Sequence, residues 1–414
     1  HFRLSARAGY FFRQQDQDAL QANRYRDFVG GVKAEWSVSP QTRVELAYHF
    51  DQYDKSDLIQ ASHRDIRDYS NVQHTTRALV SHDFAHLLPS DHGFTLTAGG
   101  DYLRDYLMSY QFEGQSRVQH SADAFVQADW TLSPHWEILG AVRYDHFSQG
   151  QHEHLTSKMS ARYRQGAFTY RAGYGQGFRA PSLKELYMHY PINGLFVLRG
   201  NENLRPERSD NFHASVDWHR HHCLLTAAFG YNLVRQRITT APPSQEREAS
   251  SGLPYIDYIN LPRLHAFSAQ LSAQNSWTLR KGTVGLRLNY AFTHEEAQQG
   301  NSLTPYLPAR PHAITARISY DLPWRMDNAW GIQLSGRWLS SIHSEEYTAS
   351  TGAMHDVHYP AYALLRLATT LSLNHAWQLS LAADNLLNYR PRIYFYNAPS
   401  TDGIDVQVGA TYRF

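Results

Sequence analysis

The polar segment Arg179–Arg208 holds the residues of this sequence that are best suited to bind a ligand. Within it, His189 is flanked by Tyr187 and Tyr190. A neutral imidazole suits iron, and aromatic side chains beside it can pack against a flat conjugated molecule. His189, Tyr187 and Tyr190 are therefore predicted to belong to a ligand-binding site.

The same segment also carries positive charge. Arg179, Lys184 and Arg199 lie in it, and basic side chains raise the local concentration of anionic ligands such as carboxylates and catecholates. We expect these three residues to contribute to the same binding site.

Other histidines gather in polar connections, but their spacing fixes no metal geometry, and a solvated turn explains them. Cys223 is the only cysteine, which excludes a disulfide framework and a thiolate metal cluster. Serine, aspartate and histidine form no nucleophile–base motif, so we expect neither an enzyme nor a resident cofactor. The histidines concerned are His152, His154, His219, His221, His222, His343, His355 and His358.

The elements that must position this segment are strands, and the clearest of them is Ile404–Phe414. Apolar and polar residues alternate strictly along it, as they do in a strand with two different faces. A strand that crosses a bilayer needs about 9–11 residues, so the length fits. The residues on the apolar face are Ile404, Val406, Val408, Ala410, Tyr412 and Phe414.

Alternation recurs in Trp136–Tyr144 and Val284–Phe292. In Val284–Phe292, Leu288 belongs to the apolar set and Arg287 to the polar set. Arginine or lysine at the bilayer midplane costs about 2–4 kcal/mol, so the charged set should face a polar interior. Tryptophans near strand ends suit the interfacial girdles. These are Trp130, Trp136, Trp277, Trp330 and Trp377.

Connections of two lengths alternate along the chain, which is typical of an antiparallel up-and-down transmembrane β-barrel. About 18 strands are predicted, and a soluble all-β protein is the alternative fold. Tight turns are expected at 39–40, 89–92, 133–134, 165–166, 219–222, 280–282, 323–328 and 374–376. Long connections are expected at 14–27, 54–71, 179–208, 240–253, 294–310 and 343–360.

Composition agrees with an all-β membrane protein. The 414 residues include 27 Tyr and 9 Trp, yet the mean hydropathy is −0.54. No run of about 18 apolar residues occurs, which argues against helical membrane spans. The net charge of +1 gives no reason to expect a nucleic-acid partner.

Two stretches, Tyr174–Tyr187 and Gly200–Asp210, carry the motifs G-F-R-A-P-S-L-K-E-L-Y and G-N-E-N-L-R-P-E-R-S. They resemble the corresponding motifs of TonB-dependent outer-membrane receptors. The resemblance extends over essentially the whole chain. It also includes Asp123–Trp130, Gly140–Asp145, Leu307–His312, Asp384–Asn388 and the terminal Phe414.

This resemblance implies a barrel of 22 strands with an N-terminal plug domain inside it. Residues 1–414 would then be a fragment, lacking the plug and the first four strands, and 179–208 would be the seventh external loop. The plug of the family engages TonB with the ExbB-ExbD complex. Nothing in residues 1–30 is similar to that segment, so we expect no energised transport by this chain alone.

The family imports ferric siderophores, haem, cobalamin and some glycans, and haem is the ligand expected first here. In haem receptors of the family, a histidine of the seventh loop can ligate the iron, which gives His189 that role. Glu202 departs from the haem motif, which usually has Pro there. A ferric siderophore or cobalamin receptor and a passive porin remain alternatives. Outer-membrane lipid, lipopolysaccharide and a surface lipoprotein are further expected partners.

Overall fold

A computed structural model of the protein describes residues 1–414 except 19, 90, 113–115, 150–152, 193, 300–301, 306–309, 325–327, 349–352, 392–400 and 414. The predictions on His152 and on the terminal Phe414 therefore lie outside the described residues, as do parts of the predicted connections 89–92, 294–310, 323–328 and 343–360. The chain divides into two compact units. Unit 1 comprises His1–Arg162, Gly173–Asn211 and Leu233–Arg263, and unit 2 comprises Tyr163–Ala172, Phe212–Asn232 and Leu264–Phe414.

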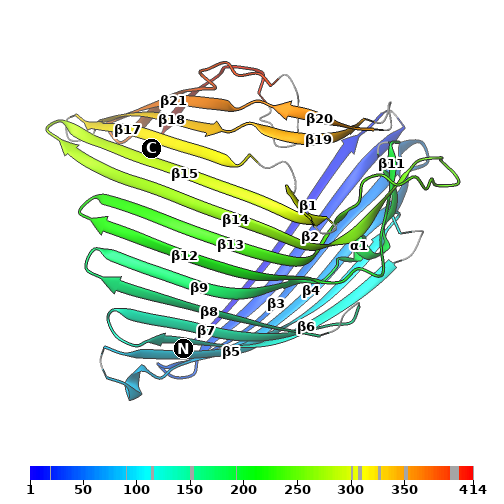
Figure 1. The fold of residues 1–414 in the computed structure, drawn as a ribbon, viewed down its shortest axis with the longest axis horizontal. Helices are drawn as coiled ribbons and strands as arrows, with labels where there is room; N and C mark the ends of the chain where they lie inside the picture. Colours follow the sequence, from blue (N-terminus) through cyan, green and yellow to red (C-terminus); the bar gives the residue numbers. More distant parts are fainter. Residues whose placement is uncertain are drawn as a thin grey trace. The chain divides into compact units, whose positions relative to one another are not determined.

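The structure is almost entirely β, and strands that follow one another in the sequence lie side by side and antiparallel (Figure 1). The first nine strands are β1 (Phe2–Asp16), β2 (Gln21–Ser37), β3 (Thr42–Ile59), β4 (Arg64–Asp83), β5 (Gly93–Ser109), β6 (Ser116–Thr131), β7 (Trp136–Phe147), β8 (Glu153–Gln165) and β9 (Phe168–Arg179). The next are β10 (His189–Ile192), β11 (Phe196–Arg199), β12 (Glu207–Arg220), β13 (Cys223–Thr240), β14 (Tyr255–Leu279), β15 (Gly282–Gln299) and β16 (Ser302–Pro305). The last are β17 (His312–Pro323), β18 (Ala329–Leu339), β19 (Ile342–Thr348), β20 (Ala353–Tyr359), β21 (Tyr362–Leu373), β22 (Trp377–Asp384) and β23 (Asp405–Tyr412).

The predicted number of strands is confirmed among the described residues. One sheet contains 21 strands, of which β10, β11 and β16 are only four residues long, and this leaves 18 long strands. β19 and β20 form a separate two-stranded sheet. The helices are one-turn elements: η1 (Gln60–Ser62), η2 (Ala85–Leu87) and α1 (Leu183–Tyr187). None of the described helices is long and apolar enough to cross a membrane.

Two predicted long connections, 14–27 and 54–71, are wrong, because paired strands occupy most of both ranges. β1 pairs with β2 as far as Asp16 and Ala22, and β3 pairs with β4 as far as Ile59 and Arg64. Ion pairs support these strand ends, including Lys55 with Asp68 at 3.3 Å. Polar residues on both faces hide such a strand from a search for alternation.

Two further predicted connections, 294–310 and 343–360, are also wrong in part. β15 continues into the first, where β16 pairs with it. The hairpin β19–β20 lies in the second. Strand β22 ends at Asp384, and Asn385 and Asn388 after it adopt left-handed backbone conformations with φ of 53° and 51°. Such conformations end a strand and suit asparagine.

The two faces of the sheet differ in polarity, as the alternation predicts. In unit 2, Leu288 and Tyr290 of β15 line an apolar hollow together with residues of β12, β13 and β14. Gly285 and Arg287 of the same strand line a polar hollow instead. The five predicted girdle tryptophans are exposed by 37–48%.

Candidate functional site

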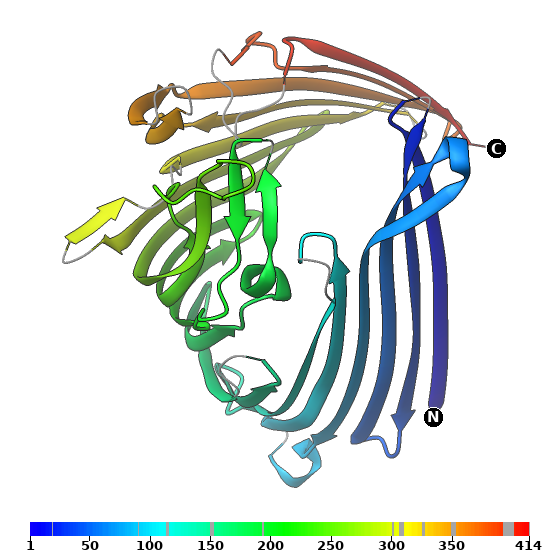
Figure 2. The ribbon, with the colours of Figure 1, turned by 90° about the vertical axis from the view of Figure 1, so that its right-hand side faces the viewer.

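The predicted binding residues lie in the connection from β9 to β12, which folds into α1, β10 and β11. Ser182 caps α1 in a capping box: its hydroxyl accepts a hydrogen bond from the Glu185 backbone N–H, and the Glu185 carboxylate accepts one from the Ser182 backbone N–H. Leu183 and Leu186 are buried and fix the helix against the strands. β10 and β11 pair as a hairpin, seen in green next to α1 in Figure 2.

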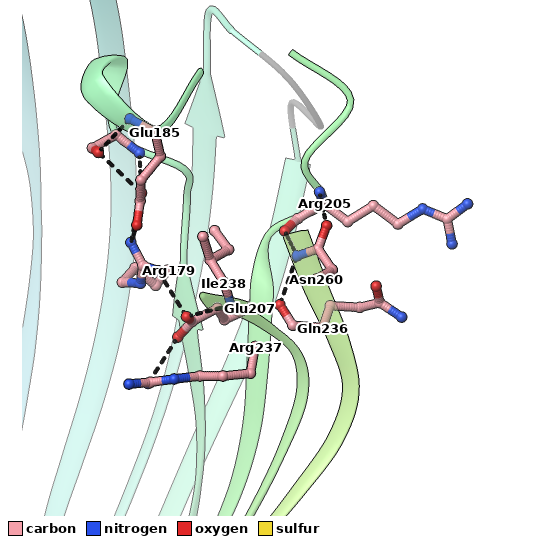
Figure 3. Close-up of polar contacts among 9 residues, drawn as sticks. Arg179, Glu185, Arg205, Glu207, Gln236, Arg237, Ile238 and Asn260 are labelled. Carbon is pink, nitrogen blue, oxygen red and sulfur yellow. Dashed lines mark hydrogen bonds and ion pairs between the residues drawn. The ribbon is translucent and has the colours of Figure 1, made fainter. Parts of the chain in front are cut away.

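A network of charged residues holds α1 to the sheet (Figure 3). Arg179, the last residue of β9, donates to Glu185 at 2.9 Å and to Glu207 at 2.7 Å. Glu207 begins β12, and its side chain is only 10% exposed. It also accepts from the backbone N–H of Ile238 at 2.8 Å and lies 3.5 Å from Arg237. One carboxylate therefore joins the connection to β9, β12 and β13.

A second contact attaches the returning part of the connection (Figure 3). The Asn260 side chain accepts from the backbone N–H of Arg205 and donates to its carbonyl, both at 2.8 Å. The same amide donates to the Gln236 carbonyl at 2.8 Å, and Gln236 has a left-handed φ of 57°. The Asn260 side chain of β14 thus forms hydrogen bonds with the backbone of two chain segments, as the backbone of a neighbouring strand would.

The close approach of two backbone segments explains why the G-N-E-N-L motif begins with a glycine. The Gly200 N–H donates to the Met188 carbonyl at 2.5 Å, and the Asn201 N–H donates to the Glu185 carbonyl at 2.9 Å. A Cβ at position 200 would lie 2.7 Å from the backbone of Leu186 and Met188. Only glycine allows the chain to pass so close to the end of α1.

Arg199 is engaged by two carboxylates. It donates to Asp257 at 2.6 Å and to Glu246 at 3.0 Å, and its guanidinium lies 4.1 Å from the Tyr255 ring centroid. These hydrogen bonds, led by that to Asp257, raise the pKa of Arg199 above its usual value. β11 also pairs in parallel with the start of β14, so Arg199 stands opposite Asp257 in the register.

Aromatic contacts join α1 and β10 to the ends of β4, β5 and β6. Tyr187 packs edge-on against Phe112, and Arg117 stacks over its ring at 4.5 Å. The Tyr190 ring meets Tyr110 edge-on at 5.6 Å. The partly buried tyrosines surround a buried cluster, and Lys184 covers the ring of Tyr69 at 5.0 Å. That cluster consists of Leu107, Phe112, Leu183 and Met188.

His189 faces a carboxylate. Its Nε2 lies 3.5 Å from Glu248 Oε1, its side chain is 29% exposed, and its backbone N–H donates to Gln111 at 2.7 Å. The hydrogen bond from the Ser251 hydroxyl holds the pKa of Glu248 below its usual value. An ionised carboxylate therefore lies close to the Nε2 atom of the imidazole.

All six predicted residues therefore come together in one part of unit 1. The structure adds partners that the sequence did not single out, namely Glu207, Arg237, Glu246, Asp257 and Asn260. Glu207 belongs to the G-N-E-N-L-R-P-E-R-S motif, so the sequence could have indicated that it takes part in the site. The other four residues lie in β13, in β14 and in the connection between these strands, where no motif marks them. Among the described residues, no group of three or more His, Cys, Asp or Glu side chains is placed to hold a metal ion.

The fold and the motifs of this connection define an outer-membrane receptor barrel. The chain belongs to the TonB-dependent receptor family, since the family model described as TonB-dependent receptor-like, β-barrel, matches residues 2–386. It is similar to the iron-regulated outer membrane virulence protein of Vibrio cholerae, with 23% identity over 278 residues. That match covers 64% of this chain and 40% of the Vibrio protein, so the chain spans less than half of this relative.

Solved structures show the same fold. The siderophore receptor PirA of Acinetobacter baumannii superimposes with a TM-score of 0.74 at 12% identity, over 100% of this chain and 71% of PirA. A mutant ferric enterobactin receptor PfeA of Pseudomonas aeruginosa, in complex with enterobactin, gives 0.69 at 14% identity, over 94% and 65% of the two chains. The FrpB iron transporter of Neisseria meningitidis gives 0.66 at 11%, over 100% and 69%.

Proposed function

We propose that this chain is the barrel part of a receptor that imports an iron-containing small molecule, with a ferric siderophore as the first ligand class. The observation that carries the proposal is the β9–β12 connection: charged and aromatic contacts hold it at the strand ends opposite the short turns. The relatives and neighbours support iron as the cargo, because their names refer to iron, siderophores or ferric enterobactin.

Energy for import would come from TonB with the ExbB-ExbD complex, acting through a plug domain of the complete receptor. The chain's own residues would supply the outer binding surface. The aromatic rings of Tyr187 and Tyr190 offer apolar contact, while Lys184 offers positive charge to a catecholate or carboxylate. Arg179 and Arg199 would act as positioning residues, since their guanidinium groups are already held by carboxylates.

Growth under iron limitation tests this proposal. The full-length receptor is expressed in a Gram-negative strain that lacks its own receptors for iron complexes, with and without TonB. We expect growth on at least one ferric siderophore, and only when TonB is present. Growth that does not need TonB would instead identify a passive pore, and rescue by cobalamin alone would contradict iron as the cargo.

Haem is the second candidate, and His189 is the observation that favours it. This histidine lies in the predicted external connection and is partly exposed, and the Glu248 carboxylate lies 3.5 Å from its Nε2 atom. Haemin titration of the full-length receptor in detergent should give a saturable Soret shift that weakens in His189→Ala. The matched control is His219→Ala, near the end of β12 and next to the short turn to β13. Equal haemin binding in all three proteins would remove His189 from the site.

A further inference from the structure

The apolar face of unit 2 carries a hollow that is separate from the β9–β12 connection. Its volume is about 420 Å³, and it lies over the neighbouring strands β12, β13, β14 and β15, beside the start of β9 (Figure 1). All of its lining residues belong to unit 2, among them Phe168, Trp218, Leu225, Leu271, Ala273 and Tyr290. Membrane barrels turn the apolar face of their strands toward lipid, so the hollow opens to the bilayer and not to the interior of the barrel.

The hollow extends from the short turns to about the middle of the membrane. Trp218 lies two residues before the end of β12, and Leu225 lies two residues after the start of β13. Tyr290 lies eight residues after the start of β15. A strand of that length, tilted by about 45°, rises about 19 Å, which is little more than half the thickness of the hydrocarbon core. Because the short turns of outer-membrane barrels face the periplasm, the hollow has the depth of the periplasmic leaflet.

Basic residues stand at the short turns next to this hollow. Arg280 and Lys281 form the turn between β14 and β15, and Arg220 is the last residue of β12. All three are exposed, and they form no ion pair with any residue that the structure describes. Neither 218–223 nor 278–283 contains an aspartate or a glutamate. We call Arg220, Arg280 and Lys281 the basic edge.

This positive charge is confined to the two hairpins that form the hollow. Arg220 follows Trp218 by two residues, so strand alternation puts it on the face of the hollow. β12 and β14 are two strand spacings apart, about 10 Å, and long basic side chains at both ends can reach one phosphate group. No net positive charge occurs in the other short connections, 38–41, 84–92, 132–135, 166–167, 324–328 and 374–376.

We propose that this face binds one anionic phospholipid of the periplasmic leaflet, with an acyl chain in the hollow and the phosphate at the basic edge. The hollow is apolar, has about the volume of a single acyl chain and lies too deep in the membrane for a headgroup. The basic edge supplies charge of the opposite sign at the level of the headgroups, where each basic residue strengthens the binding of an anionic lipid. The inference does not depend on the ligand of the β9–β12 connection.

Native mass spectrometry of the full-length receptor in a mild detergent counts the lipid molecules that stay bound and gives the Kd of the first. The probes are dioleoyl phosphatidylglycerol and dioleoyl phosphatidylcholine, which have the same acyl chains, while only the first has a net negative charge. We expect one phosphatidylglycerol molecule to bind more tightly than phosphatidylcholine. Arg220→Gln and Arg280→Gln should each weaken its binding about fivefold, which is the effect of one basic residue near an anionic lipid. Arg64→Gln is the matched control, because it removes the same charge from an exposed position at the start of β4, at the end opposite the short turns.

Ala273→Phe tests the hollow separately from the charge, since the larger side chain fills the space of the acyl chain. It should weaken phosphatidylglycerol binding at least as much as either arginine variant. Equal affinity for the two lipids would overturn the proposal, as would an equal loss in Arg64→Gln or unchanged binding in Ala273→Phe. So would a dimer of the wild-type receptor that Ala273→Phe dissociates, because a second copy of the chain would then cover the hollow.

Discussion

At the scale of single residues, the candidate site consists mainly of side chains that hold other parts of the chain. Arg179 and Arg199 each bind two carboxylates, and Asn260 binds two backbone segments. The residue types and spacing therefore predicted which residues lie together, but not which contacts each side chain makes. A basic residue in a loop can attract an anionic ligand or neutralise an acidic neighbour, and sequence position alone does not separate the two.

Replacement of Arg179 should release α1. Arg179→Ala leaves Glu207, which is 10% exposed, without its closest cation. We expect a loss of about 1–3 kcal/mol in the free energy of unfolding, below the range for fully buried pairs because Arg179 is itself 44% exposed. Urea unfolding of the full-length receptor measures the loss, and limited proteolysis within 180–206 locates it. Arg171→Ala is the matched control, because its partner Asp217 lies outside the connection. Equal proteolysis in both variants would contradict the role of Arg179.

Asn260→Asp tests the second attachment with almost no change in shape. The carboxylate cannot donate to the carbonyls of Arg205 and Gln236, so we expect about 1–2 kcal/mol of destabilisation at pH 7. Nearby carbonyl oxygens disfavour the charged form and raise the pKa of the introduced group. Stability should therefore be nearest to wild type at low pH, where the protonated carboxyl can donate, and should fall as pH rises through that pKa. Urea midpoints at several pH values check this, with Asn260→Ala as the variant expected to show no such trend.

At the scale of elements, the long strands and most short turns could be predicted from the alternation, because the bilayer imposes one apolar face on each strand. The strand ends could not. In 54–71 both faces are polar, yet β3 and β4 remain paired there, held by backbone hydrogen bonds and by ion pairs such as Lys55 with Asp68. The hairpin β10–β11 and its parallel contact with β14 were also missed, since four-residue strands carry no periodicity of their own.

The connection between β13 and β14 should open in acid. The hydrogen bond from Ser251 lowers the pKa of Glu248, so this group stabilises the folded connection above its unfolded pKa. That contribution is lost as the pH falls below the ordinary titration range of a glutamate and through the lower pKa of the folded state. Amide exchange in 241–254, corrected for intrinsic rates, should therefore accelerate at low pH. In Glu248→Gln the amide exchange of this connection should be fast at neutral pH as well as at low pH. A pH response that persists in this variant would assign the effect to another group.

At the scale of the whole molecule, the polarity of the two sheet faces decides where charge is tolerated. Leu288 and Asn289 are neighbours on β15 that point to opposite faces, and Leu288 lies in the apolar hollow. Leu288 lies six residues after the start of β15. Along a tilted strand, this length corresponds to a depth of about 14 Å from the membrane edge, which is close to the middle of the apolar band.

Leu288→Arg should therefore cost about 2–4 kcal/mol, whereas Asn289→Arg should cost about 1 kcal/mol through the lost hydrogen bond to Thr315. The folded fraction in outer membranes, read from heat-dependent migration on denaturing gels, and the urea midpoint measure the difference. Similar losses in the two variants would mean that both faces of β15 are in contact with polar surroundings.

The parallel pairing of β11 with β14 has a consequence for the order of assembly. Asp257, which stands opposite Arg199 in that pairing, follows it by 58 residues in the chain. β11 therefore has no partner on that side until β12, β13 and the first residues of β14 have been synthesised and inserted. The proposed outer binding surface can therefore form only after those strands are in place. A receptor halted earlier in biogenesis would have membrane strands but an unfolded β9–β12 connection.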